Sequence, residues 1–222
     1  VTRSPPDVLG VRGSPGKRPG WSRHHSSTMI DPSPGKAALR ATLRAARRGF
    51  VDALDAAARD SALDALTARV IAAFPRTGAV AAYIPVGAEI DPTAILEAAA
   101  RVDHKTALPF VTDRATPMRF LAWTPGDPLF PGPLGLRQPD PAAPEMAPAL
   151  IVTPLLGFDR ALNRLGQGAG FYDRAFALYP EARRIGVAWS VQEVAALACD
   201  PWDVPLHAIA TEKDWIVPET PR

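Results

Sequence analysis

Short apolar runs recur along the sequence, separated by longer mixed segments. Residues 78–85 (GAVAAYIP) are apolar throughout, and runs of the same kind occupy 105–111 (KTALPFV), 149–156 (ALIVTPLL) and 184–189 (RIGVAW). Runs of this length and composition are typical of strands that are buried on both faces, as in parallel sheets. Residues 118–123 (MRFLAW) instead alternate apolar and polar positions, which predicts a strand exposed on one face.

Helical periodicity begins after residue 32. Ser33 and Pro34 suit the N-cap and first position of a helix, and apolar residues follow at spacings of four, three and four: Leu39, Leu43, Ala46 and Phe50. A second stripe on this helix is basic, with Lys36, Arg40 and Arg44 at steps of four and Arg47 and Arg48 at its end. By charge pattern alone, this stripe is compatible with a solvated face.

Further helices are predicted at 52–74, 91–102 and 172–179. The first has Leu63, Leu66 and Val70 as its apolar stripe, and the second opens with Asp91 followed by a proline. Strand, helix and strand over residues 78–111 make a βαβ unit, so we expect an α/β fold with a largely parallel sheet. Residues 124–148 contain too many prolines for a sheet interior and are predicted to form a long loop.

The first 32 residues differ in composition from the rest of the chain. They are rich in Pro, Gly, Ser and Arg without apolar periodicity, which predicts a disordered tail (1–32) ahead of a single α/β catalytic domain (33–222). An Arg-rich, acid-poor leader is compatible with a transit peptide, but we expect Met29 to be the natural start or the preceding residues to be dispensable.

Charge and cysteine content exclude several classes of function. Residues 1–28 hold five basic residues and one acidic residue, so the chain's net charge of +2 leaves −2 for the remainder, and nucleic-acid binding is not expected. No apolar stretch approaches the ~20 residues of a membrane span. Cys199 is the single cysteine, which excludes internal disulfides and fits the reducing cytoplasm. We expect Cys199 to fill space rather than to act as a nucleophile.

A glycine-spaced segment after the third apolar run carries the candidate chemistry. Residues 158–174 read FDRALNRLGQGAGFYDR, with Gly166, Gly168 and Gly170 at alternate positions. Glycine permits positive φ and exposes backbone N–H groups, and the start of a helix favours an anion. Arg164 and Arg174 flank the loop as candidate phosphate ligands. A plain turn remains an alternative, because the spacing fits neither a Walker loop nor a dinucleotide motif.

The whole string resembles the signature of the 5-formyltetrahydrofolate cyclo-ligase family, also called 5,10-methenyltetrahydrofolate synthetases. Its matching parts are residues 158–159, 164–166, 168, 170 and 172–174, and similar motifs occur in the family's order between about Lys36 and Ile216. The resemblance implies a three-layer α/β domain related to the ribose-5-phosphate isomerase and CoA-transferase group. It also implies ATP-dependent cyclisation of 5-formyltetrahydrofolate to 5,10-methenyltetrahydrofolate, with release of ADP and phosphate.

The resemblance assigns roles to individual residues. For ATP it implies Lys36 and Arg40 of the first helix together with Arg164, Gly166, Gln167, Gly168, Ala169, Gly170, Phe171 and Tyr172. It implies Mg²⁺ binding by Asp173 and Asp203, and folate binding by Ile84, Glu89 and Trp123. Arg164, Tyr172 and Arg174 are the catalytic candidates, although Tyr172 fits a packing role equally well.

Three positions depart from the family pattern. Gln138 replaces a usual acid, Ala169 a usual glycine, and His207 stands where a second acid is common; we expect His207 to be a structural group rather than a metal ligand. These departures motivate an alternative function, a folate- or nucleotide-binding homologue without turnover. A kinase for another small metabolite is a third possibility. We expect a cytoplasmic monomer whose partners are ATP and a reduced folate, with neither nucleic acid nor membrane.

Overall fold

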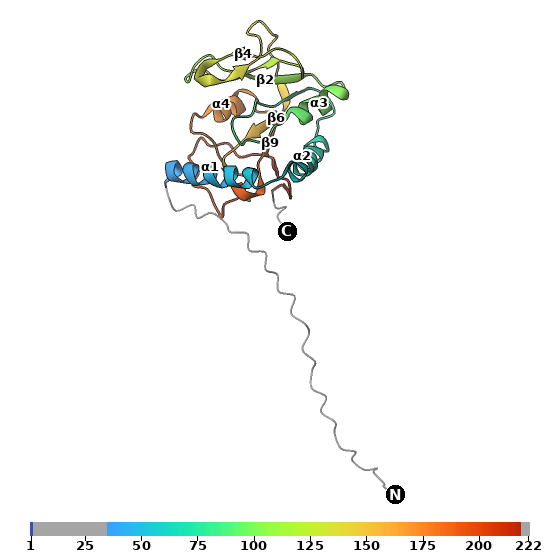
Figure 1. Cartoon of the computed structure of the whole chain (residues 1–222), viewed down its shortest axis with the longest axis vertical. Coiled ribbons are helices and arrows are strands. Elements are labelled where there is room, and N and C mark those ends of the chain that lie inside the picture. Colours follow the sequence, from blue (N-terminus) through green and yellow to red (C-terminus); the bar gives the residue numbers. More distant parts are fainter. Residues whose placement is uncertain (2–34, 219–222) are drawn as a thin grey trace.

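A seven-stranded sheet forms the centre of the protein (Figure 1). The computed structural model describes Val1 and residues 35–218, so the expected tail at 1–32 lies outside the described residues and stays a prediction. The first helix begins at Lys36 with Gly35 as its N-cap, two residues after the predicted N-cap Ser33. The strand order is β11-β10-β9-β6-β1-β2-β3. The inner strands are β10 (Ala208–Ala210), β9 (Arg183–Val187), β6 (Pro148–Pro154), β1 (Ala79–Ala81) and β2 (Thr106–Phe110).

Parallel pairing joins these five strands, whereas the two edge strands are antiparallel. β11 (Trp215–Ile216) pairs antiparallel with β10, and β3 (Arg119–Ala122) pairs antiparallel with β2. The apolar runs thus give parallel inner strands, and the alternating run 118–123 gives an edge strand. The predicted α/β class with a largely parallel sheet is confirmed.

Helices cover both faces of the sheet. α2 (Ala56–Ile71) and α3 (Thr93–Arg101) pack with Val80, Leu150 and other alternate strand residues in one core cluster. α4 (Phe171–Leu178) packs on the opposite face with Ala81 and Ile151. Figure 1 shows α2 and α3 on one side of β6 and β9, and α4 on the other. Neighbouring residues of β1 and β6 therefore contribute to different clusters, as the two-residue period of a strand requires.

The first two helices divide differently from the prediction. α1 (Lys36–Asp52) continues into the start of the segment assigned to the second helix, and α2 begins after Asp55, whose side chain accepts a hydrogen bond from the Ala58 N–H at 2.8 Å. The buried stripe of α1 is Leu39, Leu43, Arg47 and Val51, with a constant step of four. Arg47 therefore lies on the buried face, where the predicted stripe had Ala46.

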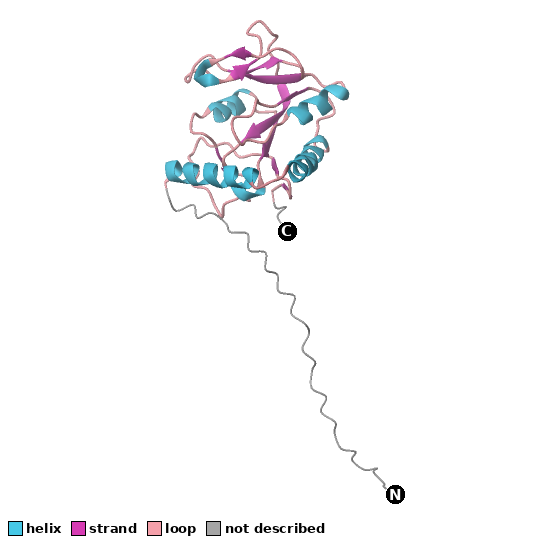
Figure 2. Cartoon of the chain, in the orientation of Figure 1, coloured by secondary structure: helices cyan, strands magenta, loops and turns pink. Residues whose placement is uncertain are grey.

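Two small hairpins lie outside the main sheet. β4 (Phe130–Pro131) pairs with β5 (Arg137–Gln138) inside the proline-rich segment, on either side of the 3₁₀ helix η1 (Pro133–Gly135). β7 (Gly157–Phe158) pairs with β8 (Arg164–Leu165), so a hairpin separates β6 from the glycine-spaced loop that we expected to follow it directly. A second 3₁₀ helix, η2, spans Ser190–Gln192. Loops connect most of these short elements (Figure 2).

The strand order reverses between β1 and β6. β1 continues through α3 to β2 on one side, whereas β6 leads to β9 and β10 on the other. Open α/β sheets bind ligands in the crevice that forms at such a reversal, beyond the carboxyl ends of the strands. The segments that leave β1 and β6 at this edge are residues 82–91 and the β7–β8 hairpin with its glycine loop.

Candidate active site

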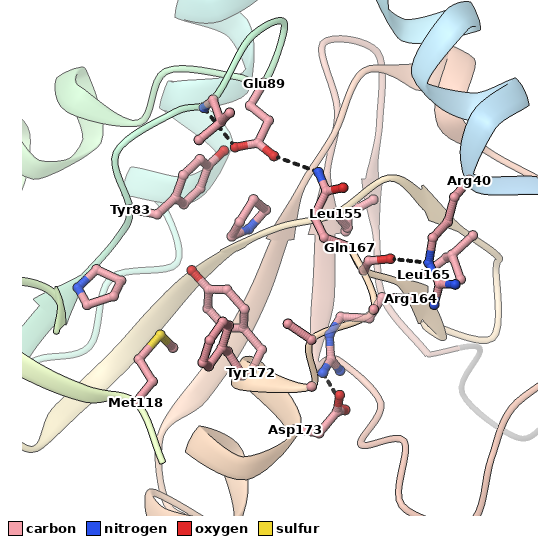
Figure 3. A pocket seen from close by; sticks show the side chains of 18 of the residues that line it. Arg40, Tyr83, Glu89, Met118, Leu155, Arg164, Leu165, Gln167, Tyr172 and Asp173 are labelled. Atoms are coloured by element: carbon pink, nitrogen blue, oxygen red, sulfur yellow. Dashed lines mark hydrogen bonds and ion pairs between the residues drawn. The ribbon is translucent and has the colours of Figure 1, made fainter. Parts of the chain in front are cut away.

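A cleft of about 1760 Å³ lies at this reversal point. Its walls include α1, the segment after β1, the glycine-spaced loop at 166–170 with the start of α4, and residues 197–204, with further lining from residues 109–118 and 134–138. Figure 3 shows Arg40, Glu89, Gln167 and Tyr172 from these walls. Cavities that hold one small molecule usually measure about 300–1,000 Å³. The cleft is therefore large enough for two substrates side by side.

The glycine loop forms one wall of the cleft and ends at the first residue of α4. Gly168 and Gly170 have φ values of +96° and +67°, and Gly170 is the N-cap of α4, which begins at Phe171. Arg40 of α1 lies against the loop, where its Nε donates to the Gly166 carbonyl at 2.9 Å. A Cβ atom on Gly168 would lie 3.3 Å from the Arg40 guanidinium carbon. The sequence prediction of positive φ is thus correct for two of the three glycines.

Both arginines that flank the loop already have protein partners. Arg164 donates to the Asp173 carboxylate at 2.5 Å and to the Val204 carbonyl, and its side chain is only 6% exposed. Arg174 donates to the carbonyl oxygens of Ala169 (3.1 Å) and Arg114 (2.9 Å). Arg174 therefore connects the glycine loop to the segment between β2 and β3, in addition to lining the cleft.

Lys36 and two aspartates form an ion-pair cluster at the other end of the loop. The Lys36 ammonium lies 2.5 Å from Asp200 and 3.3 Å from Asp203. The hydrogen bond to Asp200 is the main cause that raises the pKa of Lys36, so the ammonium stays charged. Asp203 also accepts the Asp200 N–H at 2.8 Å. The first residue of α1 is thus connected to the segment before β10.

The two aspartates expected to bind a metal ion lie in the same part of the cleft. Asp173 accepts the Val204 N–H at 3.3 Å, which brings it next to the residue that follows Asp203. Within the described residues, all hydrogen bonds of each carboxylate use one oxygen, Oδ1 of Asp173 and Oδ2 of Asp203. The second oxygens are available as hard ligands, which fits Mg²⁺ held by two carboxylates and phosphate oxygens. No group of three potential metal ligands occurs among the described residues.

Glu89 lies on the opposite side of the cleft, in the turn after β1. Its carboxylate accepts the Val86 N–H at 3.0 Å and the Gln167 side-chain amide at 3.3 Å. Arg47 of α1 approaches it to 3.7 Å, and both side chains are less than 10% exposed. Arg44 donates to Gln167 at 2.7 Å. Gln167 therefore links α1 and Glu89 through its side chain.

Tyr172 projects from the first turn of α4 into the cleft, on the side of Tyr83 (Figure 3). Burial, with a smaller contribution from Glu89, raises the pKa of its hydroxyl far above the ordinary value. Burial and Glu89 also raise the pKa of Tyr83, whose hydroxyl donates to the Ile90 carbonyl at 2.7 Å. Tyr172 is therefore protonated at neutral pH, so it can donate a hydrogen bond to a ligand but cannot serve as a base.

One predicted site residue lies away from the cleft. Trp123 is 8% exposed, belongs to the core cluster under α2 and α3, and donates from its indole nitrogen to the Asp127 carbonyl at 3.1 Å. The structure does not place it with Ile84 and Glu89, the other two residues predicted to bind folate, because its position at the end of β3 directs the ring into the core. The other predicted residues line the cleft: Lys36, Arg40, Ile84, Glu89, Arg164, residues 166–174 and Asp203.

Some cleft residues were not assigned from the sequence. Arg44 and Arg47 line the cleft. From the sequence they were assigned only to the basic stripe of the first helix, and the spacing of that stripe was the one sign that they share a face with Lys36 and Arg40. Asp200 and Trp202 also line the cleft, and Trp202 is 69% exposed there. The sequence around Asp200 and Trp202 shows no periodic pattern, so their closeness to Asp203 in the sequence was the available indication that they belong to the site.

The three departures from the family pattern have structural roles. Gln138 is buried and accepts the Val111 N–H at 3.1 Å. Ala169 contributes its carbonyl to Arg174, a contact that any residue can make. His207 accepts the Arg184 N–H at 2.9 Å through Nδ1, as expected for a structural histidine.

A sequence model of the 5-formyltetrahydrofolate cyclo-ligase family matches residues 32–212. The chain belongs to this family. Among curated 5-formyltetrahydrofolate cyclo-ligases, that of Mycolicibacterium smegmatis is 30% identical over 191 residues, which cover 82% of this chain and 96% of the relative. The enzyme of Escherichia coli K12 is 30% identical over 144 residues, covering 61% of this chain and 79% of the relative.

Solved structures agree with the fold. The 5,10-methenyltetrahydrofolate synthetase of Aquifex aeolicus superposes with a TM-score of 0.70 at 24% identity, covering 84% of this chain and 94% of the other. The Mycoplasma pneumoniae synthetase gives 0.63 at 23% identity, covering 81% and 99%. The predicted family, enzyme class and fold class are confirmed. None of the helices within residues 35–218 has the length and apolar composition needed to cross a membrane.

Proposed function

We propose that the cleft binds ATP, Mg²⁺ and a reduced folate together, and that the protein cyclises 5-formyltetrahydrofolate to 5,10-methenyltetrahydrofolate in the cytoplasm. The observation that carries this proposal is the meeting of two chemically different walls in one cleft. One wall has a glycine loop, a helix N-terminus and basic side chains. The other has the buried acid Glu89 beside apolar residues such as Ile84 and Val86.

The first wall suits a triphosphate. Micromolar affinity requires about 8 kcal/mol, whereas one helix N-terminus contributes only about 0.3–1 kcal/mol per charge. Lys36, Arg40 and Arg164 add cationic groups around the loop. Since Lys36 and Arg164 are already paired with aspartates, we expect phosphate to compete with these carboxylates for the same cations.

Mg²⁺ would be held by Asp173 and Asp203 together with phosphate oxygens, because each aspartate retains one oxygen without a contact among the described residues. The ion would neutralise the charge that develops on the transferring phosphoryl group. Arg164 donates directly to the Asp173 carboxylate. Its guanidinium would therefore orient this metal ligand and donate to a phosphate oxygen.

The chemistry of the reaction explains why both substrates must be bound at once. A formyl oxygen is a poor leaving group, so it attacks the γ-phosphorus of ATP and displaces ADP. N10 of the folate then bonds to the activated carbon and loses its proton to solvent, and the carbon–oxygen bond breaks to release phosphate. These steps need positioning and charge stabilisation rather than a protein nucleophile. The protonated Tyr172 is available as a hydrogen-bond donor between the two walls.

The decisive experiment is to follow the methenyl-folate absorbance after mixing the protein with 5-formyltetrahydrofolate, Mg²⁺ and ATP. We expect a rise that requires ATP. Asp173→Asn should abolish it while the fold is retained, and Asp64→Asn, at an exposed position of α2, should leave it unchanged. Folate or ATP binding without any rise would favour the non-catalytic homologue. ADP release that does not depend on a formylated folate would favour a kinase for another metabolite.

A further inference from the structure

Arg47 is a buried cation in the wall of the cleft. It belongs to the inward-facing stripe of α1, between Leu43 and Val51, and its side chain is 7% exposed. It nevertheless lines the cleft. A charged group is costly to bury unless it has charged and hydrogen-bonding partners. The position of Arg47 therefore raises the question of which groups satisfy its guanidinium.

Within the described residues, the partners of Arg47 are incomplete. Its nearest carboxylate oxygen, on Glu89, lies 3.7 Å away, which is too long for a hydrogen bond. Its Nε is enclosed without any hydrogen-bond partner. Arg164 is a useful comparison, since it is buried to the same degree but donates to both Asp173 and Val204. Arg47 thus has N–H donors without a hydrogen-bond acceptor among the described residues, while the nearby Glu89 carboxylate balances its positive charge.

We propose that Arg47 binds the reduced folate directly, by donating to the C4 carbonyl oxygen of the pterin ring while Glu89 accepts from the neighbouring N3–H and 2-amino groups. This proposal rests on the proposed function. A pterin carries an N3–H and a 2-amino group beside its C4 oxygen, so one edge offers donors and an acceptor together. Arg47 offers donors for the C4 oxygen and Glu89 offers acceptors for the two N–H groups, and the two side chains lie next to each other.

Two other ligands for Arg47 are less compatible with its surroundings. A phosphate group bound to Arg47 would be repelled by the Glu89 carboxylate, which lies 3.7 Å from the guanidinium. The formyl oxygen must act as a nucleophile towards phosphorus, and donation from a cation would lower its nucleophilicity. The C4 oxygen takes no part in bond making, so a hydrogen bond to it costs the reaction nothing and fixes the ring.

Binding measurements without ATP test the proposal. Arg47→Met removes the donors at similar volume, and it should weaken 5-formyltetrahydrofolate binding about 10- to 100-fold while ATP binding changes less than about twofold. Arg59→Met, at an exposed position on α2, is the control and should change neither. If Arg47→Met loses ATP affinity instead, or binds the folate as the wild type does, the proposal is wrong. Wild-type protein that binds no 5-formyltetrahydrofolate would refute the proposed function itself.

A double-mutant cycle separates direct binding from positioning of Glu89. In a Glu89→Gln background, Arg47→Met should still weaken folate binding by about tenfold. No further loss would mean that Arg47 acts only through Glu89, which would overturn the proposal. If Arg47→Met does not fold, Arg47→Lys provides the same comparison, because it retains the charge and loses the planar donor set.

A reduced folate analogue with a 4-amino group in place of the C4 oxygen identifies the atom that Arg47 contacts. The amino group would face the guanidinium donors, so wild-type protein should bind the 4-oxo compound at least tenfold more tightly. The 4-amino analogue also lacks the N3–H that Glu89 accepts, so part of this preference belongs to Glu89. Arg47→Met should therefore reduce the preference at least about threefold without abolishing it. An unchanged ratio would place the Arg47 contact elsewhere and contradict the proposal.

Discussion

Replacing Gly168 by alanine tests whether the glycine loop is built around Arg40. At a φ of +96°, an alanine is strained by about 1–2 kcal/mol, and its Cβ would lie 3.3 Å from the Arg40 guanidinium carbon. If the loop keeps its conformation, the melting temperature should fall by about 2–8 °C. If the loop relaxes, its binding conformation must be restored by ATP, which should weaken ATP binding about 5- to 30-fold.

Gly166→Ala is the matched control in the same loop. Gly166 has no positive φ, and a Cβ there meets no atom within 4 Å. We expect its stability to remain within about 0.5 kcal/mol of the wild type. Thermal unfolding and calorimetric ATP titration of both variants are sufficient measurements. If Gly168→Ala matched Gly166→Ala in stability and the wild type in ATP affinity, the conformational requirement at Gly168 would be refuted.

Lys36→Met should raise the KM for ATP about tenfold, because it removes one charge-assisted contact of roughly 1.5 kcal/mol. The KM for folate should stay unchanged, and equal rises in both KM values would contradict the two-wall arrangement. Gln138→Leu should lower unfolding stability in urea by about 1–3 kcal/mol, because the buried Val111 N–H loses its acceptor; Gln138→Glu keeps an acceptor and should lose less. Burial, with a further contribution from Arg184, lowers the pKa of His207 below its usual value near 6.5. The stability from its neutral ring is complete above pH 6.5 and is lost as the pH falls through the lowered pKa, so the melting temperature should decrease more from pH 7 to pH 5 in the wild type than in His207→Gln; identical curves would refute this.

Patterns of apolar residues predict the sheet better than the helix boundaries. The runs 105–111 and 184–189 each overlap a strand, β2 (Thr106–Phe110) and β9 (Arg183–Val187), because a segment that is apolar on both faces suits a strand buried on both faces. The second helix was predicted to begin at residue 52, whereas α1 ends at Asp52 and α2 begins at Ala56. Residues 52–56 contain no glycine or proline to mark the boundary. The β7–β8 hairpin has strands of two residues each, too short to show a period.

Family motifs predict which residues gather in the cleft, but not how they are paired. The family resemblance implied that Lys36 and Asp203 serve one site, whereas the ion pair between them depends on a contact across 167 positions. Arg47 was overlooked because a charged residue is normally assigned to the solvent side of an amphipathic helix. Trp123 lies in the core and not in the cleft lining, because a motif gives the neighbourhood of a side chain and not the face of the strand on which it lies.

The attachment of α1 has a consequence for local opening of the protein. Its first half packs through Leu39 and Leu43 on a small cluster with Leu165 and Val194, separate from the two large cores. Segments with few buried contacts open at lower free energy than the rest of a fold. We therefore expect backbone amides in this half of α1 to exchange with deuterium before those of β6, and ATP to slow that exchange because Lys36 and Arg40 lie on the same segment. The local opening of α1 would then also be the motion that admits ATP to the cleft.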